Sequence, residues 1–554
     1  MRPLDWAVLA LSLAGIVAYG LHKGRGNTTT RDYLLAGKTM PWYAMALSIM
    51  ATQASAITFI STTGQAYVDG MRFVQFYFGL PLAMVILSAT AVPVFHRANV
   101  YTAYEYLELR FDAKTRTLVS VIFLIQRGLG VGLALYAPAV VLTVILGWPD
   151  RLTILLMGGL VILYTALGGI KAVTWTDVQQ MLIIFAGLLA ALAAALWLLP
   201  PGVSIVDALR LAGAAGKLNA VDLSLDPNNR YTLWSGLIGG MFLALSYFGT
   251  DQSQVQRYLT GRSVAQSRLS LLFNAVAKVP MQFLVLLIGA LVFVFFIFER
   301  PPLLFHPSEL ARLRAGEPSW SAIERRFEEA FLQRRRAAWD LLEARRRGRP
   351  WRDQQRAFQQ AGAELETVRR QAIGGINDAN YIFLSFVTRY LPAGLVGLIL
   401  AAVFAAAMST ISAEINSLAT VTVMDLYRRH WRRQAEDRRY LRASRLATVF
   451  WGCYAVAFAQ YGRNLGSLIE AVNMVGSLFY GSMLGVFVLA FFFPRVGGTA
   501  AFLGVLAGEA AILWSHFSTG ISFLWYNVVG SLVVIGAGLA IQRVLPANRQ
   551  VYRR

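Results

Sequence analysis

The sequence predicts an all-α protein that crosses a membrane many times. Its 554 residues are 56% hydrophobic and only 15% charged, and the mean hydropathy is +0.52. Stretches of about 18 or more mostly apolar residues recur along the whole chain, which is the length that the hydrocarbon core requires of a helix. The two-residue alternation of a membrane β-barrel is absent, and unpaired backbone is costly in lipid, so helices are the expected spanning elements.

The apolar stretches predict about thirteen transmembrane helices. Residues 1–22 have no basic run before the apolar stretch and no small-residue cleavage pattern after it, so we expect an extra helix that is retained. Two further extra helices are expected over 499–542. The predicted spans are 4–21, 42–62, 74–95, 118–147, 152–170, 176–200, 233–256, 270–298, 379–407, 446–461, 466–493, 499–516 and 523–542.

Arginine and lysine predict the orientation in the membrane. They crowd one side, in the block RRHWRRQAEDRRYLRASR at 428–445 and in the tail at 543–554. Because basic loops stay in the cytoplasm, we expect the amino end outside and the carboxyl end inside, in a plasma membrane such as the bacterial inner membrane. The net charge of +21 then reflects topology and attraction to anionic membrane lipids, and no nucleic-acid partner is expected.

Residues 299–376 form a long charged insert that falls on the outer side. A loop of more than about 60 residues is translocated largely regardless of its charge, so the orientation stands. Interleaved Glu and Arg at spacings of three and four predict two polar helices joined by a turn at Gly348-Arg349-Pro350. A solvated decoration is the main interpretation. A lid or a docking surface for an external partner is the alternative.

The sequence lacks the usual signatures of enzymes. Cys453 is the single cysteine, which excludes a disulfide framework and a thiolate metal cluster. The five histidines show no HExxH spacing, and no GxxxxGK[ST] loop is present. We therefore expect no enzyme activity, no cofactor, no transition metal and no ATP hydrolysis. Transport driven by a gradient, or a passive or sensing role, remains.

Two predicted spans become polar partway along. The span that starts at 42 carries Thr52, Gln53, Ser55 and Thr58 in its middle, and the span that starts at 233 changes to Gly-Thr-Asp-Gln-Ser at 249–253. Transporters built from inverted repeats bind their solutes at helices that break near the midplane. The two spans would then open two five-helix repeats, 42–200 and 233–493. For either span alone, a polar stripe packed against neighbouring helices is the other interpretation.

The stretch AAAMSTISAEINS at 405–417 places a third polar run inside an apolar span. Polar groups in lipid are costly and often functional. Together with DYLLAGKTMPWYAMALSIMATQASA at 32–56, YTALGGIKAVTWTDVQQMLIIFAG at 164–187 and SYFGTDQSQVQRYLTGRS at 246–263, this stretch resembles the sodium/solute symporter family. The resemblance implies a LeuT-type core of five plus five inverted helices with extra terminal helices. It also implies sodium-coupled import of a small polar or anionic solute by alternating access.

The resemblance implies a sodium site between the break of the first core helix and the eighth core helix. Na⁺ is a hard cation that several converging carbonyl and hydroxyl oxygens can hold. Hydroxyls that bond back to the preceding turn of their own helix are the structural alternative. Carried over by motif, the ligands are the backbone oxygens of Ala51, Ala54 and Ala406 and the hydroxyls of Ser409 and Thr410.

A second sodium site of some family members would use Asp177 and Ser412. The next matching position is Ala413, where a hydroxyl is expected, so a structural role for Asp177 is the equal alternative.

The substrate pocket is expected beside the ion, along the two broken helices. Ile57 and Thr58 stand where the sugar-transporting branch carries Glu and Gln, which argues against a hexose. An intramembrane Arg127 needs an acidic partner or an aqueous cavity, and with Lys278 it could receive a carboxylate. The predicted pocket residues are Gln53, Ser55, Thr58, Asp251, Gln252, Lys278 and Arg127.

Three alternatives to sodium symport remain. Proton coupling would use an acid, with Asp177 or Glu414 as suspects. A transporter-like sensor is disfavoured because the sequence ends at Arg554, soon after its last apolar stretch. A channel would not need the hydroxyls of the ion site.

Overall fold

The computed structural model describes residues 1–26, 28–147, 149–317, 319–460 and 468–545, and within these ranges the chain is helical without a strand. The first half contains α1 (Pro3–Lys23), α2 (Thr30–Leu35), η1 (Ala36–Lys38), α3 (Trp42–Gln53), η2 (Thr58–Thr62), α4 (Thr63–Asp69), η3 (Gly70–Tyr77), α5 (Leu80–Ala89), α6 (Ala91–Ala98), α7 (Ala103–Arg110), α8 (Ala113–Leu146), α9 (Asp150–Trp197), α10 (Ile205–Ala214), η4 (Ser235–Gly239), α11 (Gly240–Gly249) and α12 (Gln252–Leu259). The second half contains α13 (Val264–Phe298), α14 (Pro307–Gly316), α15 (Trp320–Arg346), α16 (Arg352–Ile373), α17 (Ala379–Tyr390), α18 (Leu395–Val421), η5 (Thr422–Trp431), α19 (Asp437–Ala459), α20 (Leu468–Phe492), α21 (Gly498–Ser518) and α22 (Phe523–Val544).

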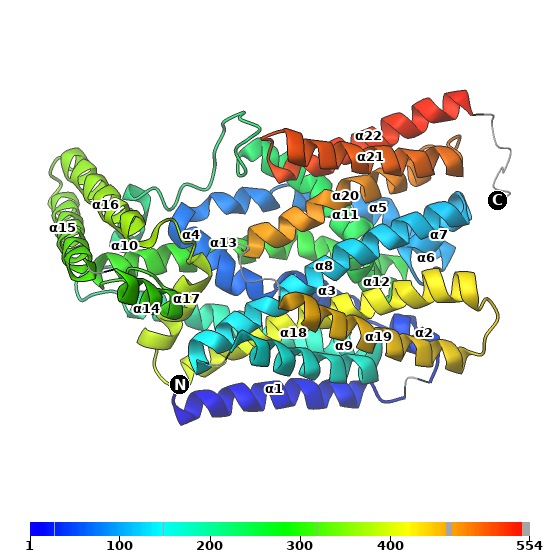
Figure 1. Ribbon diagram of the computed structural model, residues 1–554, viewed down its shortest axis with the longest axis horizontal. Coiled ribbons are helices and arrows are strands. Elements are labelled where there is room, and N and C mark those ends of the chain that lie inside the picture. The colour runs from blue at the N-terminus through cyan, green and yellow to red at the C-terminus, as the bar shows by residue number, and fades with distance from the viewer. Residues whose placement is uncertain (27, 148, 318, 461–467, 546–554) are drawn as a thin grey trace.

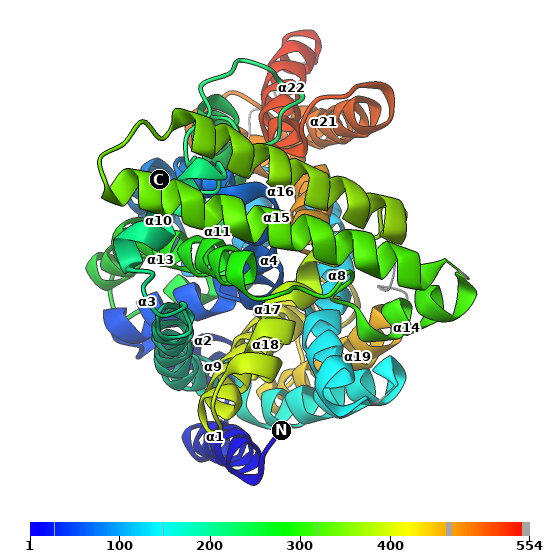
Figure 2. The same ribbon diagram turned by 90° about the vertical axis from the view of Figure 1, so that its left-hand side faces the viewer.

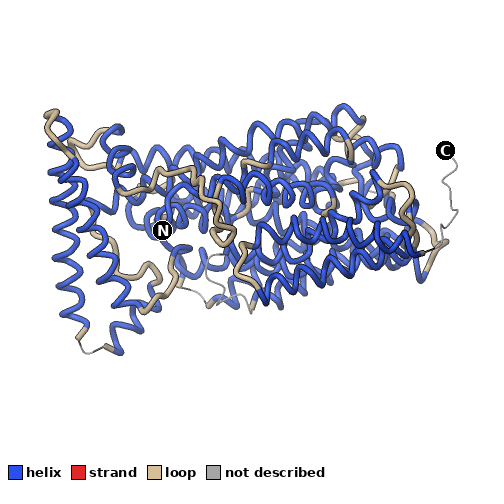
Figure 3. Tube along the Cα trace, turned by 90° about the horizontal axis from the view of Figure 1, so that it is seen from above, coloured by secondary structure: helices blue, strands red, loops and turns tan. Residues whose placement is uncertain are grey.

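Most of the long helices run side by side in one elongated bundle (Figures 1 and 3). The extra helix α1 lies along one side of the bundle, and α21 and α22 lie along the opposite side (Figure 1). In the described ranges, nine helical segments are long and apolar enough to cross a membrane. The total of about thirteen spans therefore stays a prediction, as does the tail at 543–554, most of which lies outside the described residues.

Both helices predicted to break are broken. The first stops at Gln53, and Ala54 has a non-helical ψ of 62° before the chain resumes as η2 and α4. The second stops at Gly249, and Asp251 then caps α12 by accepting a hydrogen bond from the Ser253 N–H at 2.9 Å. A helix end leaves its last carbonyls or first N–H groups without intrahelical partners, so each break exposes backbone that can bind something else. The repeat boundaries 42–200 and 233–493 stay predictions.

Helix α9 is two helices joined at Gly169. The φ of 58° and ψ of −168° at Gly169 lie outside the helical region, in backbone that only glycine adopts easily. Tyr164 before the kink and Asp177 after it bind the neighbouring residues Met408 and Ser409 of α18. The sequence predicts the two arms of α9 as two spans, 152–170 and 176–200.

Helix α18 is the centre of the bundle. From Ile399 to Val421 every residue is buried, and none of the polar side chains faces the outer surface of the bundle. The polar run at 405–417 is therefore enclosed by protein, which is where a membrane protein can keep polar groups at tolerable cost.

The insert forms the helical hairpin α15–α16, with Gly348 at its turn in a left-handed conformation (φ 64°). The hairpin lies across one end of the bundle, perpendicular to its long axis (Figures 2 and 3). The interpretation as a solvated decoration is incomplete. Ala338, Leu341, Leu342 and Phe358 are buried in the main hydrophobic core, because one face of each helix is apolar and packs against the bundle.

Candidate functional site

The break in the first core helix faces the polar run of α18. The Thr410 hydroxyl donates to the carbonyl of Thr52 at 2.9 Å and to the carbonyl of Ala406, one turn back in its own helix, at 3.1 Å. Thr52 stands between Ala51 and Ala54, whose backbone oxygens are the other predicted ligands. The structure therefore brings the end of α3 and the Thr410 hydroxyl together. The Thr52 carbonyl, which is not among the predicted ligands, makes the direct contact.

The Ser409 hydroxyl points to a carboxylate next to this gap. It donates to Asp177 Oδ1 at 2.6 Å. The other oxygen of Asp177 accepts hydrogen bonds from the Ser48 hydroxyl at 2.5 Å and from Arg257 Nη2 at 3.2 Å. Asp177 and Arg257 have no solvent exposure, so each charge compensates the other inside the bundle.

The two residues of the predicted second sodium site bind different partners. Ser412 donates to the carbonyl of Ser409 at 3.0 Å within its own helix, as serine often does in a membrane helix. Asp177 is held by Arg257 and two serines. This arrangement corresponds to the structural alternative for Asp177.

A cavity of about 90 Å³ adjoins the gap. Its wall contains four of the predicted pocket residues, Gln53, Ser55, Thr58 and Arg127, together with Thr410. The remaining wall includes aromatic side chains, two amides and one acid. These are Phe76, Tyr77, Tyr247 and Tyr480, the amides of Gln126 and Asn473, and the carboxylate of Glu414.

Arg127 is the centre of a buried charged cluster in this wall. It donates to Glu414 Oε1 and to the Tyr480 hydroxyl, both at 2.7 Å, and it also contacts the Asp251 carboxylate. Its guanidinium lies over the Tyr247 ring, 5.5 Å from the centroid. Arg127 thus has both of the environments expected for a cation inside the membrane, acidic partners and a cavity. Asp251 does not line the cavity and reaches it only through Arg127 and Tyr480.

Besides Asp251, two more predicted pocket residues, Gln252 and Lys278, do not line the cavity. The Gln252 amide accepts from the Ala103 N–H and donates to the Tyr101 carbonyl, each at 3.0 Å, so its side chain binds α7 and the chain segment before it. It lies just beyond the break, where the start of α12 turns its side chain to α7. Lys278 lies behind the cavity wall, with its Nζ 5.4 Å from the centroid of Tyr77, and it finds no hydrogen-bond partner among the described residues.

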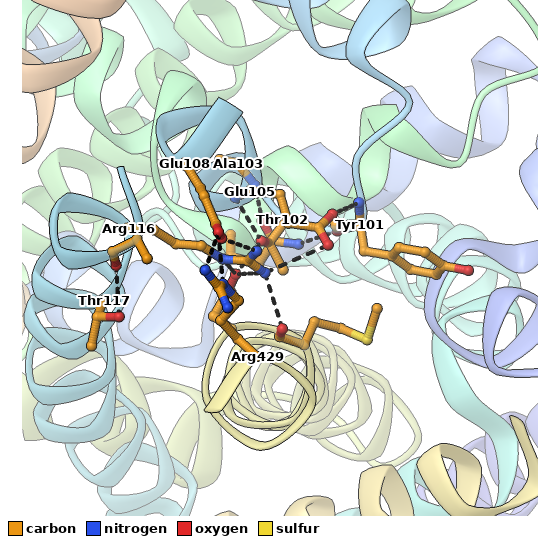
Figure 4. Close-up of polar contacts among 12 residues, drawn as sticks. Tyr101, Thr102, Ala103, Glu105, Glu108, Arg116, Thr117 and Arg429 are labelled. Atoms are coloured by element: carbon orange, nitrogen blue, oxygen red, sulfur yellow. Dashed lines mark hydrogen bonds and ion pairs between the residues drawn. The ribbon is translucent and has the colours of Figure 1, made fainter. Parts of the chain in front are cut away.

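Helix α7 connects the second helix break to a charged cluster at the end of the bundle that holds the basic block. The Tyr104 hydroxyl donates to the Thr250 carbonyl at 2.9 Å. In the cluster, Arg116 binds Glu108 and Asp425, and Glu108 also accepts from Arg429 at 2.6 Å (Figure 4). Burial alone would raise the pKa of Glu108, but the hydrogen bonds from Arg429 and Arg116 lower it below its ordinary value. Glu108 therefore stays charged, and the cluster joins α7, α8 and η5.

Sequence reasoning left several cavity residues out of the predicted pocket. Glu414 could have been found, because it follows Thr410 by one helical turn and so lies on the same face of α18. Tyr480 and Asn473 come from α20, whose sequence reads as an ordinary apolar span. Only the packing of α20 against the broken helices brings them to the cavity.

The chain is similar to known sodium-coupled transporters. The sequence model of the family described as "Sodium:solute symporter family" matches residues 33–310 and 359–508 of this chain. The sodium-dependent multivitamin transporter of Oryctolagus cuniculus is 30% identical over 547 residues, which are 97% of this chain and 72% of that protein. The sodium-coupled monocarboxylate transporter 1 of Homo sapiens is 29% identical over 92% of this chain and 72% of that protein. The sodium/iodide cotransporter of Homo sapiens is 28% identical over 92% of this chain and 69% of that protein.

A solved structure shares the fold. A Na⁺-coupled sialic acid symporter in its substrate-bound outward-open state superposes with a TM-score of 0.79, covering 99% of this chain and 100% of that one at 23% identity. Together with the family match, this likeness confirms the predicted resemblance and the all-α fold class with broken core helices.

Proposed function

We propose, for a chain that belongs to the sodium:solute symporter family, that the coupling ion lies between the break after α3 and the Thr410 hydroxyl. Sodium-coupled symport of a small solute follows from the family membership, and Na⁺ is the coupling ion. The observation that carries the ion site is the 2.9 Å contact between Thr410 and the Thr52 carbonyl. Oxygens of Ala51, Ala54, Ala406 and Ser409 lie beside this contact in the sequence and would complete a hard oxygen site.

The proposed solute is a small anion, such as a carboxylate, bound in the 90 Å³ cavity. Two observations support it. Arg127 lines the cavity and offers a planar guanidinium, which suits carboxylates. Several relatives are named for vitamins, monocarboxylates or iodide. Ser55 and Thr58 add hydroxyl groups to the same wall.

The multi-pass membrane location is a property of the family and of the apolar helices. We propose a plasma membrane, with the arginine-rich end of the bundle and the carboxyl end in the cytoplasm and the α15–α16 hairpin outside. The crowding of arginine at 428–445 supports this orientation. Membrane lipids are the expected surroundings.

A thermal-shift screen of the purified full-length protein against a panel of carboxylates, amino acids, hexoses and inorganic anions tests the proposal. We expect a carboxylate to raise the unfolding temperature in sodium buffer and to have little effect in choline buffer. Uptake of that carboxylate into proteoliposomes should need an inward sodium gradient. Equal accumulation in choline would contradict sodium coupling. If the accumulation then followed a pH gradient, it would favour proton coupling through Glu414.

A further inference from the structure

A second and larger cavity, of about 440 Å³, lies beneath the α15–α16 hairpin. Its floor is the end of α4, the segment that follows α10 and part of α13, and its roof is the hairpin. Figure 2 shows the hairpin crossing this end of the bundle. The volume falls in the range of small-molecule sites, whereas the central cavity is much smaller.

Two cations in this cavity lack a carboxylate partner within the described residues. Lys217 Nζ is 4.7 Å from the centroid of the Phe293 ring, and Arg334 Cζ is 5.9 Å from the same centroid. The two charged groups are therefore at most about 10.6 Å apart, the sum of these distances. Lys217 donates to the Val68 carbonyl and Arg334 to the Phe296 carbonyl at 2.5 Å, and both acceptors are neutral. Arg334 is 5% exposed, and its buried Nε has no partner in the described part of the chain.

The other charges of the lining are mostly paired with each other. Arg369 binds Asp378 at 2.5 Å, and Arg370 binds Glu366 at 3.0 Å. Asp69 also lines the cavity and attracts Lys217, but no ion pair joins the two. Burial lowers the pKa of Lys217 to about 8, and the nearby Arg334 adds to that effect while Asp69 opposes it. A net positive charge thus remains on one side of an enclosed space.

Apart from Gln359, the rest of the lining is mostly apolar. Phe293, Phe305, Phe327 and Phe358 face the cavity, together with Tyr67. Phe327, Arg334 and Phe358 belong to residues 311–358, which the family match leaves out. The insert therefore completes this cavity, which shares no lining residue with the central cavity.

We propose that the hairpin cavity binds a small organic anion, whose carboxylate lies between Lys217 and Arg334 and whose apolar body packs against the four phenylalanines. An anion at this position supplies the charge that the two cations lack, and hydrogen bonds between charged groups are the stronger kind. The aromatic walls make favourable contacts with an apolar body, which is poorly solvated in water. The site is independent of sodium, because none of its residues belongs to the gap at Thr410.

The test uses 4-fluorobenzoate as the probe and the full-length protein in detergent micelles, in sodium-free choline buffer. Saturable broadening of the ¹⁹F resonance should report binding. The neutral isostere 4-fluorobenzamide should not compete. Lys217→Gln should weaken binding at least tenfold, and so should Arg334→Gln. Arg356→Gln, which removes an exposed charge from the same hairpin outside the cavity, should leave binding unchanged.

Three results would overturn the proposal: Lys217→Gln binding as well as the parent protein, Arg356→Gln weakening binding as much as Lys217→Gln, or 4-fluorobenzamide binding equally well. If Arg334→Gln does not fold, Lys217→Gln alone decides, because the Lys217 side chain makes a single described hydrogen bond and is only partly buried. Thr410→Val separates this site from the central one. The variant should keep 4-fluorobenzoate binding while it loses sodium dependence of transport, and loss of probe binding in Thr410→Val would place the probe in the central cavity instead.

Discussion

Removal of one hydroxyl at Thr410 probes the proposed ion site directly. Thr410→Val keeps the shape of the side chain and deletes the oxygen that contacts the Thr52 and Ala406 carbonyls at 2.9 and 3.1 Å. In the absence of sodium the loss is one neutral hydrogen bond, about 0.5–1.5 kcal/mol of stability. In the presence of sodium the variant loses the contact between the hydroxyl oxygen and the ion. This contact contributes about 1.5–3 kcal/mol of binding free energy, so the sodium affinity should be roughly 10- to 100-fold weaker.

The assay is a titration of the unfolding temperature with NaCl at constant ionic strength, with choline as the replacement cation. We expect the half-saturating sodium concentration to rise at least tenfold in Thr410→Val, while the unfolding temperature without sodium changes little. Thr448→Val is a matched control, because Thr448 is also buried and donates to the Ser444 carbonyl one turn back at 2.8 Å. An unchanged sodium titration in Thr410→Val, or an equal change in Thr448→Val, would refute the assignment of Thr410 as a ligand.

Three further predictions concern charge and packing. Asp177→Asn should leave the buried Arg257 without its counter-charge and cost about 3–5 kcal/mol, measured as a lower unfolding temperature or a loss of folded protein. Leu341→Ala, at a side chain that is 1% exposed, should cost about 2–5 kcal/mol if the hairpin packs as part of the core, whereas a solvated decoration would tolerate it. Lys217 should be half neutral at about pH 8, against pH 10.5 for an ordinary lysine. Its acylation rate should therefore stop rising at a lower pH than the acylation rate of exposed lysines. Its lowered pKa also means that its contribution to stability rises between these two pH values, because the unfolded chain then binds the additional proton.

The sequence was sufficient for the features that arise from local composition. Apolar length predicted the long helices, and clustered hydroxyls and glycines predicted breaks near Ala54 and Asp251. Alternating Glu and Arg with a glycine turn predicted the hairpin. In each case the physical cause lies within a few consecutive residues, so one sequence without relatives is enough to show it.

Features that depend on partners distant in the sequence were predicted poorly. Arg257 has no local signal that it neutralises Asp177, since the two are 80 residues apart and meet only in the folded bundle. Gln252 stands in a polar run that suggests a pocket, but the start of α12 turns its side chain to α7. The apolar face of the hairpin was also missed, because the charged residues dominate the composition of 320–373.

The cluster around Arg127 connects sodium binding to solute binding through charge. At their ordinary charges, Arg127 and Lys278 balance Asp251 and Glu414, so the region is neutral when empty. A monoanion alone would leave it with one negative charge, and a sodium ion beside Thr410 would restore neutrality, so each ligand should favour the other.

Glu414→Gln removes one negative charge a single helical turn from Thr410, about 6 Å along the axis, which is worth about 2–3 kcal/mol to a sodium ion at that range. We expect this variant to bind sodium at least tenfold more weakly and to bind the carboxylate found in the thermal-shift screen more tightly without sodium. If Glu414→Gln changes neither affinity, electrostatic coupling through this cluster is wrong, and the two ligands must instead communicate through movement of the broken helices.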